Sequence, residues 1–266
     1  MSPATPLVSF APNHEDVVLW RALGDVPSGR YVEICTGLPS GRTVTRALYE
    51  RGWTGIVVEA DDERAESHRA DRSRDVVVAT GSAVVAAAAT APGDPANVHV
   101  MVVDTAGTEH EVLSLFDLRS FRPWVLVIRA TAPGSAVPTR AAWEDGVVTA
   151  GYRPCLFDGV SQFYVAEEHA DRYGDVLAYP ACSLDGATDA TTLEALRDRE
   201  VVLDELRRWR SEALSSWSGA SAPAGELARA RAELAAVAED LHQVRNTLSW
   251  RITRPLRAAR RRADHA

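Results

Sequence analysis

Residues 31–59, YVEICTGLPSGRTVTRALYERGWTGIVVE, decide the fold of this 266-residue chain. The stretch begins with a short apolar strand, passes through a turn into a helix with one apolar face, and ends in a second apolar strand. A strand, helix and strand within about 30 residues form a βαβ unit. Because such units are right-handed, both strand ends and the start of the helix meet at one crevice, where open α/β sheets bind their ligands.

This crevice has the features of a nucleoside site. Glu33 lies in the first strand, and Gly37 after it lets a ligand approach the backbone. Glu59 ends the second strand, where a carboxylate can accept hydrogen bonds from both ribose hydroxyls. The unit alone does not separate a nicotinamide cofactor from S-adenosylmethionine, and it is also compatible with a plain parallel-sheet core.

Composition and length favour one globular domain with an extension. Of the residues, 46% are hydrophobic and 25% are charged, which suits a sizeable core. The formal net charge of -8 argues against a general nucleic-acid binder. All the basic residues other than histidine are arginines.

The cysteines and the apolar segments indicate a cytoplasmic protein. Cys35, Cys155 and Cys182 are widely separated and show no CxxC spacing, so neither a disulfide framework nor a metal site is expected. The N-terminus lacks the pattern of a signal peptide, and no apolar stretch approaches the length of a membrane span.

Further strands extend the sheet. A polar helix over 61–71 precedes a third strand over 75–81, a fourth strand over 98–104 ends at Asp104, and a fifth occupies 122–133. A helix over 138–152 then leads to two alternating runs, 153–158 and 161–169, that predict a hairpin. A mostly parallel sheet closed by an antiparallel hairpin predicts an α/β fold of the class I methyltransferase type, a Rossmann-like arrangement.

A helix is also predicted before the first strand, over residues 13–23, NHEDVVLWRAL. Asn13 is the expected N-cap, and Glu15 and Asp16 favour the positive end of the helix. Two interpretations remain for this polar start: it only caps the helix, or the helix is a lid over the crevice.

Five segments together resemble a known family. They are SFAPNHEDVVLWRAL (9–23), YERGWTGIVVEAD (49–61), VVDTAGTEHEVL (102–113), RPWVLVIRATAP (122–133) and LFDGVSQFYVAEEH (156–169). In this order and spacing they resemble the FkbM-type family of S-adenosylmethionine-dependent methyltransferases, over roughly residues 8–170. The resemblance implies a class I methyltransferase fold, S-adenosylmethionine as cofactor, and O-methylation of hydroxyls on sugars or polyketide-like natural products.

The chain departs from the family pattern at four positions, one of which is Gly37, where an asparagine is common. Cys35 stands where the family has glycine after the first strand, and Ala106 replaces an acid after the fourth. Arg129 stands where the fifth strand often has glutamate. The side chain of Cys35 is expected to crowd the methionine end of the cofactor, and Arg129 reverses the charge near the acceptor.

The predicted site residues lie at the carboxyl ends of the strands or just after them. Those predicted to bind the cofactor are Glu33, Cys35, Thr36, Gly37, Glu59, Ala60, Gly81, Ser82 and Asp104. Methyl transfer to a hydroxyl also needs a group that takes the proton. Asp104 is the best-placed candidate, with Glu109 and His110 in the next helix as further catalytic candidates and His14 as another base. The structural alternatives are that Asp104 caps the next helix and that Glu109 only complements its dipole.

The pattern changes after the sheet domain, which we place at 1–185. A helix is expected over 190–217, a flexible linker over 218–225, and a coiled-coil helix with a basic tail over 226–266. In the second helix, Leu227, Leu234, Leu241 and Leu248 recur every seven residues, with Ala230, Val237 and Val244 between them. Such a seam needs a partner, which is either a second copy in a homodimer or the preceding helix in a hairpin.

The chain closes with an arginine-rich tail that also contains apolar residues. Its arginines are Arg251, Arg254, Arg257, Arg260, Arg261 and Arg262, and its apolar residues include Trp250, Ile252 and Leu256. This pattern suits peripheral contact with an anionic membrane, at the inner face for a cytoplasmic protein, or an acidic partner. A frayed basic tail is the alternative.

Two functions of different classes follow. The first is an S-adenosylmethionine-dependent O-methyltransferase acting on a glycan or natural product. The second is a catalytically degenerate relative that serves as a scaffold in a biosynthetic complex. A nicotinamide oxidoreductase ranks third, because no GxGxxG motif follows the first strand.

Overall fold

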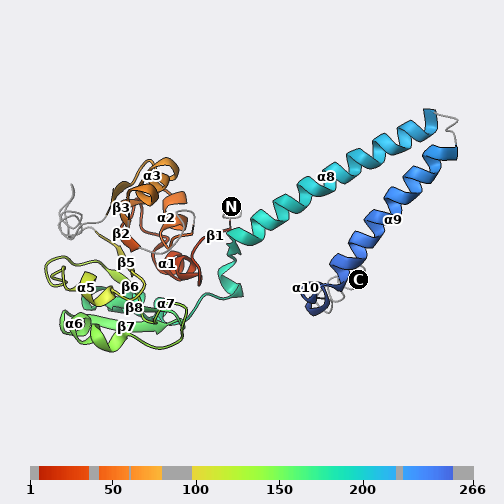
Figure 1. Cartoon of the computed structure of the whole chain (residues 1–266). Helices are drawn as coiled ribbons and strands as arrows, with labels where there is room; N and C mark the ends of the chain where they lie inside the picture. The colour runs from red at the N-terminus through yellow and green to blue at the C-terminus, as the bar shows by residue number, and fades with distance from the viewer. Residues whose placement is uncertain (1–5, 36–41, 60, 80–97, 220–223, 254–266) are drawn as a thin grey trace. The chain divides into compact units, whose positions relative to one another are not determined.

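The chain divides into two compact units. The computed structural model describes residues 6–35, 42–59, 61–79, 98–219 and 224–253 (Figure 1). The first unit comprises Met1–Leu196 and the second Arg197–Ala266. Each unit is described by itself below.

A mixed sheet forms the centre of the first unit. Among the described residues it has seven strands in the order β4-β3-β2-β5-β6-β8-β7. The strands are β2 (Arg30–Cys35), β3 (Thr54–Glu59), β4 (Val76–Ala79), β5 (Val100–Asp104), β6 (Val125–Arg129), β7 (Tyr152–Phe157) and β8 (Ser161–Ala166). The pairs from β4 to β6 are parallel, whereas β8 is antiparallel to both β6 and β7. This is the predicted class I methyltransferase sheet, and the fold class is confirmed.

The register brings the predicted strand-end residues to one edge of the sheet. Cys35 at the end of β2 pairs with Asp104 at the end of β5. Val103 pairs with Ile128, so Arg129 at the end of β6 follows next to Asp104. Because these strands are parallel, their carboxyl ends share an edge with Glu59 at the end of β3.

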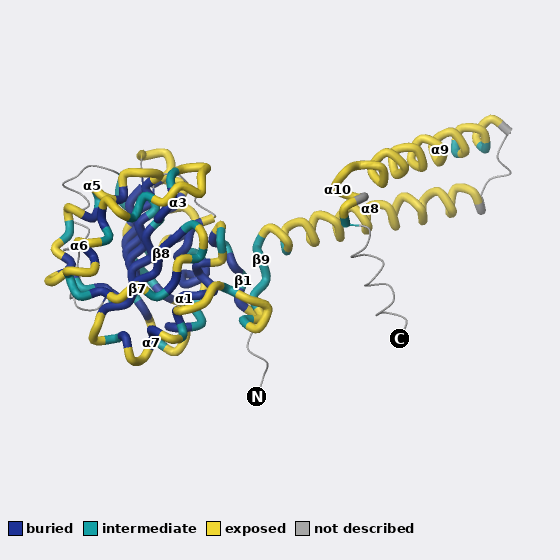
Figure 2. The backbone as a smooth tube through the Cα atoms, turned by 90° about the horizontal axis from the view of Figure 1, so that it is seen from below, coloured by how far each residue is buried: buried dark blue, intermediate teal, exposed yellow. Residues whose placement is uncertain are grey.

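Helices cover both faces of the sheet. They are α1 (Glu15–Leu23), α2 (Arg46–Glu50), α3 (Asp62–Asp71), α5 (Glu109–Leu113), α6 (Glu144–Thr149) and α7 (Ala170–Leu177). Short 3₁₀ turns occupy Arg140–Ala142, Glu167–His169 and Ser183–Asp185. Figure 2 shows the buried strands lying between exposed helical segments.

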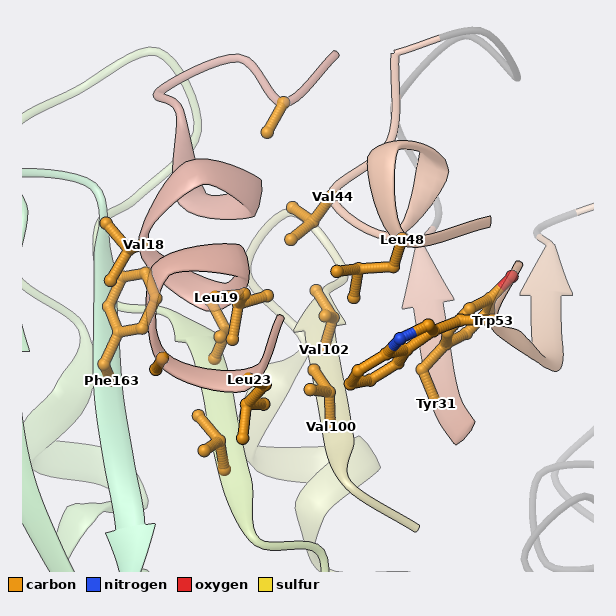
Figure 3. Close-up of a cluster of buried hydrophobic side chains, with 14 of the residues drawn as sticks. Val18, Leu19, Leu23, Tyr31, Val44, Leu48, Trp53, Val100, Val102 and Phe163 are labelled. Carbon is orange, nitrogen blue, oxygen red and sulfur yellow. The ribbon is translucent and has the colours of Figure 1, made fainter. Parts of the chain in front are cut away.

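Alternation along the strands divides the core into two clusters. Val100 and Val102 of β5 pack with α1 and α2, where Leu19 and Leu48 are fully buried (Figure 3). Met101 belongs to the second cluster, on the side of α5 and α6. Successive side chains point to opposite faces, so the apolar residues Val100–Val103 of β5 bury both faces, as a central parallel strand requires.

The start of α1 differs from the prediction, because Asn13 is not its N-cap. The N-cap is His14, in the left-handed region at φ 61°, and its side chain makes no capping bond. Asn13 instead donates from Nδ2 to the carbonyl of Asp158 at 3.3 Å. The carboxylate of Asp16 holds this start by accepting from Ser9 Oγ at 2.7 Å and from two backbone amides.

The helix after β2 is shorter than predicted. Only Arg46–Glu50 is helical, because the side chain and amide of Thr45 bond to Glu33 in β2. Gly52, at φ 92°, then turns the chain toward β3, a backbone conformation that glycine adopts without strain.

A small parallel pair was not predicted. β1 (Val8–Ser9) pairs with β9 (Thr188–Asp189), joining the N-terminal segment to the residues before the long helix. The pair is only two residues long on each side, too short for its sequence to show alternation.

Exposed helices make up the second unit. α8 (Ala190–Gly219) begins in the first unit, and α9 (Ala224–Asn246) and α10 (Leu248–Ile252) follow. Side chains along α9 are largely exposed (Figure 2). Among the described residues, no helix is both long enough and apolar enough to cross a membrane.

Candidate functional site

Glu59, predicted to hold a ribose, is fixed by the helix that follows it. Its Oε1 lies 2.7 Å from Nδ1 of His68 in α3, and both side chains are fully buried. Within the described part of the chain, Oε2 is buried without a hydrogen-bond partner. An unpaired buried acceptor is costly, so this oxygen has a strong preference for a donor.

The hydrogen bonds of His68 define its tautomer. Arg72 Nη1 lies 3.0 Å from His68 Nε2, and a guanidinium can only donate. Nε2 is therefore the acceptor, and Nδ1 carries the proton that is donated to Glu59. This arrangement fixes the carboxylate of Glu59 through a neutral imidazole.

Arg72 connects this pair to a second strand-end acid. Its fully buried guanidinium lies 3.6 Å from Glu33 Oε2 in β2 and 2.8 Å from Asp75 Oδ2. The same group also donates to Tyr31, Thr43 and Thr45. Glu33 and Glu59 are thus joined by a buried chain that runs through Arg72 and His68.

Both carboxylate oxygens of Glu33 have partners, whereas Oε2 of Glu59 has none among the described residues. Thr45 donates to Oε2 from its hydroxyl and to Oε1 from its amide at 3.4 Å. With Arg72 also against Oε2, the carboxylate of Glu33 stabilises the junction between β2 and α2. The carboxylate of Glu33 therefore already has two hydrogen-bond donors and one ion-pair partner.

The carboxyl ends of β5 and β6 hold an ion pair. Nη1 of Arg129 lies 3.3 Å from Oδ1 and 3.2 Å from Oδ2 of Asp104, with both side chains about one fifth exposed. Burial raises the pKa of Asp104, and the charge of Arg129 opposes this shift. Asp104 is therefore an oriented carboxylate whose proton affinity lies above that of an ordinary aspartate.

The turn after β5 is held by Glu109. Ala106 and Gly107 both have positive φ, 54° and 110°, so the chain reverses sharply after Asp104. Oε1 of Glu109 accepts from the amides of Thr105 at 3.1 Å and Gly107 at 3.0 Å. The structure therefore gives Glu109 a role in stabilising this turn, which the sequence did not predict.

Further acids lie where α1 meets β8. Glu15 Oε1 accepts from Ser161 Oγ at 3.2 Å, and Ser161 pairs with Arg129 in the sheet. Burial raises the pKa of Glu15 to about 7, and the nearby charge of Asp158 adds to the shift. The first turn of α1 thus lies at the edge that holds Asp104 and Arg129, which favours the lid interpretation of this helix.

Two other predicted bases face different surfaces. His110 is exposed and lines a groove of about 540 Å³ between α5 and α6, whose described lining does not include Asp104. His14 bonds to Ser9 Oγ at 3.0 Å and lines a smaller hollow with Cys182 and Asp189. Neither histidine is grouped with the strand-end acids.

Several predicted cofactor residues lie outside the described residues. They are Thr36, Gly37, Ala60, Gly81 and Ser82. Of the predicted set, Cys35, Glu59 and Asp104 end their strands at this edge of the sheet, and Glu33 lies two residues before the end of β2.

Sequence reasoning missed the buried pair His68 and Arg72. The sequence predicts only a polar helix over 61–71. Ala65, His68 and Arg72 are nevertheless spaced by three and four residues, which places them on one side of the helix. That spacing was the available signal, and all three residues are fully buried.

Comparisons with known proteins show similarity in structure only. No protein-family profile and no curated protein matches the sequence. Similar solved structures include a TehB-like SAM-dependent methyltransferase from Corynebacterium glutamicum, with 11% identity and a TM-score of 0.40, covering 57% of this chain and 86% of that one. An O-methyltransferase from Bacillus cereus in complex with SAH has 14% identity and a TM-score of 0.40, covering 61% and 84%.

A third similar structure is the fibrillarin pre-rRNA processing protein of Methanococcus jannaschii, with 11% identity and a TM-score of 0.39, covering 57% of this chain and 76% of that one. Similarity of this degree does not identify an activity, a cofactor or an acceptor. The fold assignment rests on the strand order and register of the chain itself, which define a class I methyltransferase sheet.

Proposed function

We propose that the chain is an S-adenosylmethionine-dependent O-methyltransferase. The observation that carries the proposal is Glu59: it ends β3, its orientation is fixed by His68, and its Oε2 has no partner among the described residues. A ribose hydroxyl is a donor of the kind this oxygen lacks. The residues present therefore fit the nucleoside part of the cofactor.

The chain's own groups would act on the acceptor as follows. S-adenosylmethionine supplies an electrophilic methyl group when bound. Asp104 takes the proton of the acceptor hydroxyl, and burial, which raises the pKa of Asp104, makes it a stronger base than an ordinary aspartate. Arg129 holds the carboxylate in place, and the first turn of α1 limits the access of water.

The acceptor class rests on the family resemblance. The five segments that resemble the FkbM-type family support a hydroxyl of a sugar or a natural product as the acceptor. Fold alone does not choose an acceptor, because one sheet architecture serves many substrates.

Calorimetric titration of the full-length chain with S-adenosylhomocysteine tests cofactor binding. We expect saturable heat, and a loss of about 1–3 kcal/mol of binding free energy in Glu59→Ala if the carboxylate holds the hydroxyls. No heat at millimolar ligand, with the chain folded, would rule out the enzyme. Equal affinity in Glu59→Ala would place the pocket elsewhere.

A scaffold without catalysis is the second candidate. The observation in its favour is Arg129, which bonds to both oxygens of Asp104 and so competes with an acceptor proton for them. A degenerate relative would bind neither S-adenosylmethionine nor its product, or would bind them without turnover. Transfer of a labelled methyl group to candidate glycans, measured for the wild type and for Asp104→Asn, separates the two: an active wild type and an inactive variant support the enzyme.

A further inference from the structure

The seam of α9 is exposed and entirely aliphatic. Leu227, Leu234 and Leu241 form one row and Ala230, Val237 and Val244 form the other. The side chains of Leu234, Val237, Leu241 and Val244 are 71%, 50%, 48% and 52% exposed. A 23-residue helix gains little from propensity alone in water, so burying this stripe is what stabilises it.

The charges beside the seam have opposite signs on its two sides. With the leucines at heptad position a and Val or Ala at d, the g positions are Glu226, Glu233 and Asp240. The e positions are Arg231, Ala238 and Arg245. Acids therefore line one flank, and the charged residues of the other flank are both arginines.

This distribution selects an orientation. In a parallel pair of α9 helices, each g residue faces the e residue five positions later on the other chain. Glu226 then meets Arg231, and Asp240 meets Arg245, so both charged pairs attract. In an antiparallel pair g faces g and e faces e, and every charged pair that forms repels.

We propose that α9 binds α9 of further copies of this chain in a parallel coiled coil. The preceding helix is a poorer partner, because Arg210 stands between Leu203 and Trp217 at the same seven-residue spacing in α8. The assembly holds two or more copies, because the pairing between g and e residues fixes the orientation of the helices and not their number. Parallel association brings the C-terminal ends of the copies together.

The molar mass of the full-length chain tests self-association. We expect light scattering to give a multiple of the chain mass, and Leu234→Asp to raise the concentration for half-association by more than tenfold. Ala232→Asp is the matched control, because it adds the same charge at an exposed f position off the seam. A monomer at all concentrations, or equal effects of the two variants, would overturn the proposal.

Disulfide trapping tests the orientation. In a parallel assembly each core position faces itself, so Ala230→Cys and Leu241→Cys each cross-link by themselves under mild oxidation. In an antiparallel pair of fully overlapping helices a positions face d positions, so position 230 lies near position 241, and only a mixture of the two variants cross-links. Ala232→Cys and the wild type, with its own three cysteines, are the controls. Cross-linking only in the mixture would overturn the parallel assignment.

A charge exchange gives an independent check. Arg231→Glu places two acids opposite each other in the parallel assembly and should weaken association several-fold. Adding Glu226→Arg restores an attractive pair with reversed polarity and should recover most of the loss. Absence of recovery, in a variant that remains helical, would contradict the predicted contact between Glu226 and Arg231.

Discussion

His68 Nδ1 lies 2.7 Å from Glu59 Oε1, with both side chains fully buried at the end of β3. The helix that follows a strand thus fixes the carboxylate with which that strand ends. Because Arg72 can only donate to the other ring nitrogen, the imidazole has one available tautomer, and Glu59 has one available orientation. His68 is a positioning residue for whatever donor meets Glu59 Oε2.

Two substitutions at His68 separate positioning from packing. His68→Asn and His68→Leu both remove the acceptor used by Arg72, but Asn retains a donor near the place of Nδ1. We expect His68→Leu to weaken S-adenosylhomocysteine binding roughly tenfold, about 1.4 kcal/mol, and His68→Asn to weaken it less. Titration calorimetry on both variants measures the difference.

Thermal unfolding supplies the control for this pair. His68→Leu leaves Glu59 buried without its donor, which should cost about 1–3 kcal/mol of folding stability. If both variants bind with the same affinity while differing in stability, the histidine supports only the core and does not position Glu59 for a ligand.

Cys35 allows a test of crowding at the cofactor crevice. Its side chain is buried at the end of β2, directly beside Asp104 in the register. Cys35→Gly removes the side chain at this strand end, and we expect tighter S-adenosylhomocysteine binding, by roughly 1 kcal/mol. Glycine in a strand should also lower stability by about 0.5–1 kcal/mol.

Cys35→Ala identifies the atom responsible. Alanine retains Cβ and removes sulfur, so improved binding in both variants assigns the crowding to sulfur, and improvement in glycine alone assigns it to Cβ. Unchanged or weaker binding in both Cys35→Gly and Cys35→Ala would mean that the thiol packs productively and that the crevice has adapted to it.

The sheet was predictable from sequence because its signals are local. Strands such as Val100–Asp104 are continuous apolar runs, and the hairpin from Tyr152 to Ala166 alternates around a turn at Gly159. The start of α1 was not predictable in the same way. Asn13 is a good cap by residue type, but it bonds to the carbonyl of Asp158, a contact across 145 residues that no local pattern contains.

The sequence predicts the edge of the sheet at which the site residues lie, but not the hydrogen-bond partners of those residues. Parallel topology alone places Glu59, Asp104 and Arg129 at one edge. The partners of these groups come from other elements: His68 approaches Glu59 from α3, and α1 brings Glu15 to Ser161 of β8. Hydrogen bonds between distant elements depend on packing, which composition and periodicity do not encode.

Glu15 predicts a dependence of stability on pH. Burial raises its pKa from 4.5 to about 7 in the folded state, so between these values the folded chain holds a proton that the unfolded chain has lost. Its contribution to stability is therefore complete below pH 4.5 and is lost as the pH rises to about 7. The loss amounts to about 3 kcal/mol.

Glu15→Gln removes this titration while retaining an acceptor for Ser161. Denaturant unfolding across that pH range should show the stability of the wild type falling relative to the variant. Asp158→Asn removes the neighbouring charge and should give a smaller fall than the wild type. A stability difference between wild type and Glu15→Gln that does not change with pH would show that Glu15 stays ionised in the folded chain.

The C-terminal arginines predict binding to anionic membranes that depends on assembly. A chain ending at Gly219 should keep the thermal unfolding of the sheet unit but lose both self-association and vesicle binding, because the seam and the six arginines are absent.

Each basic residue near an anionic surface contributes about 1 kcal/mol to membrane binding, and parallel association brings the tails of several copies together. Replacing Arg260, Arg261 and Arg262 with Gln, or separating the copies with Leu234→Asp, should therefore each weaken sedimentation with phosphatidylserine vesicles.

Salt and lipid charge distinguish electrostatic attraction from apolar insertion. The range of the arginine charges falls from about 10 Å at 0.1 M salt to about 3 Å at 1 M, so binding should decline over this range and be absent on uncharged vesicles. Binding that is equal on uncharged vesicles would instead assign the contact to Trp250 and Ile252, which are 38% and 68% exposed. If neither vesicle binds while the chain self-associates normally, the membrane prediction for the basic end is wrong.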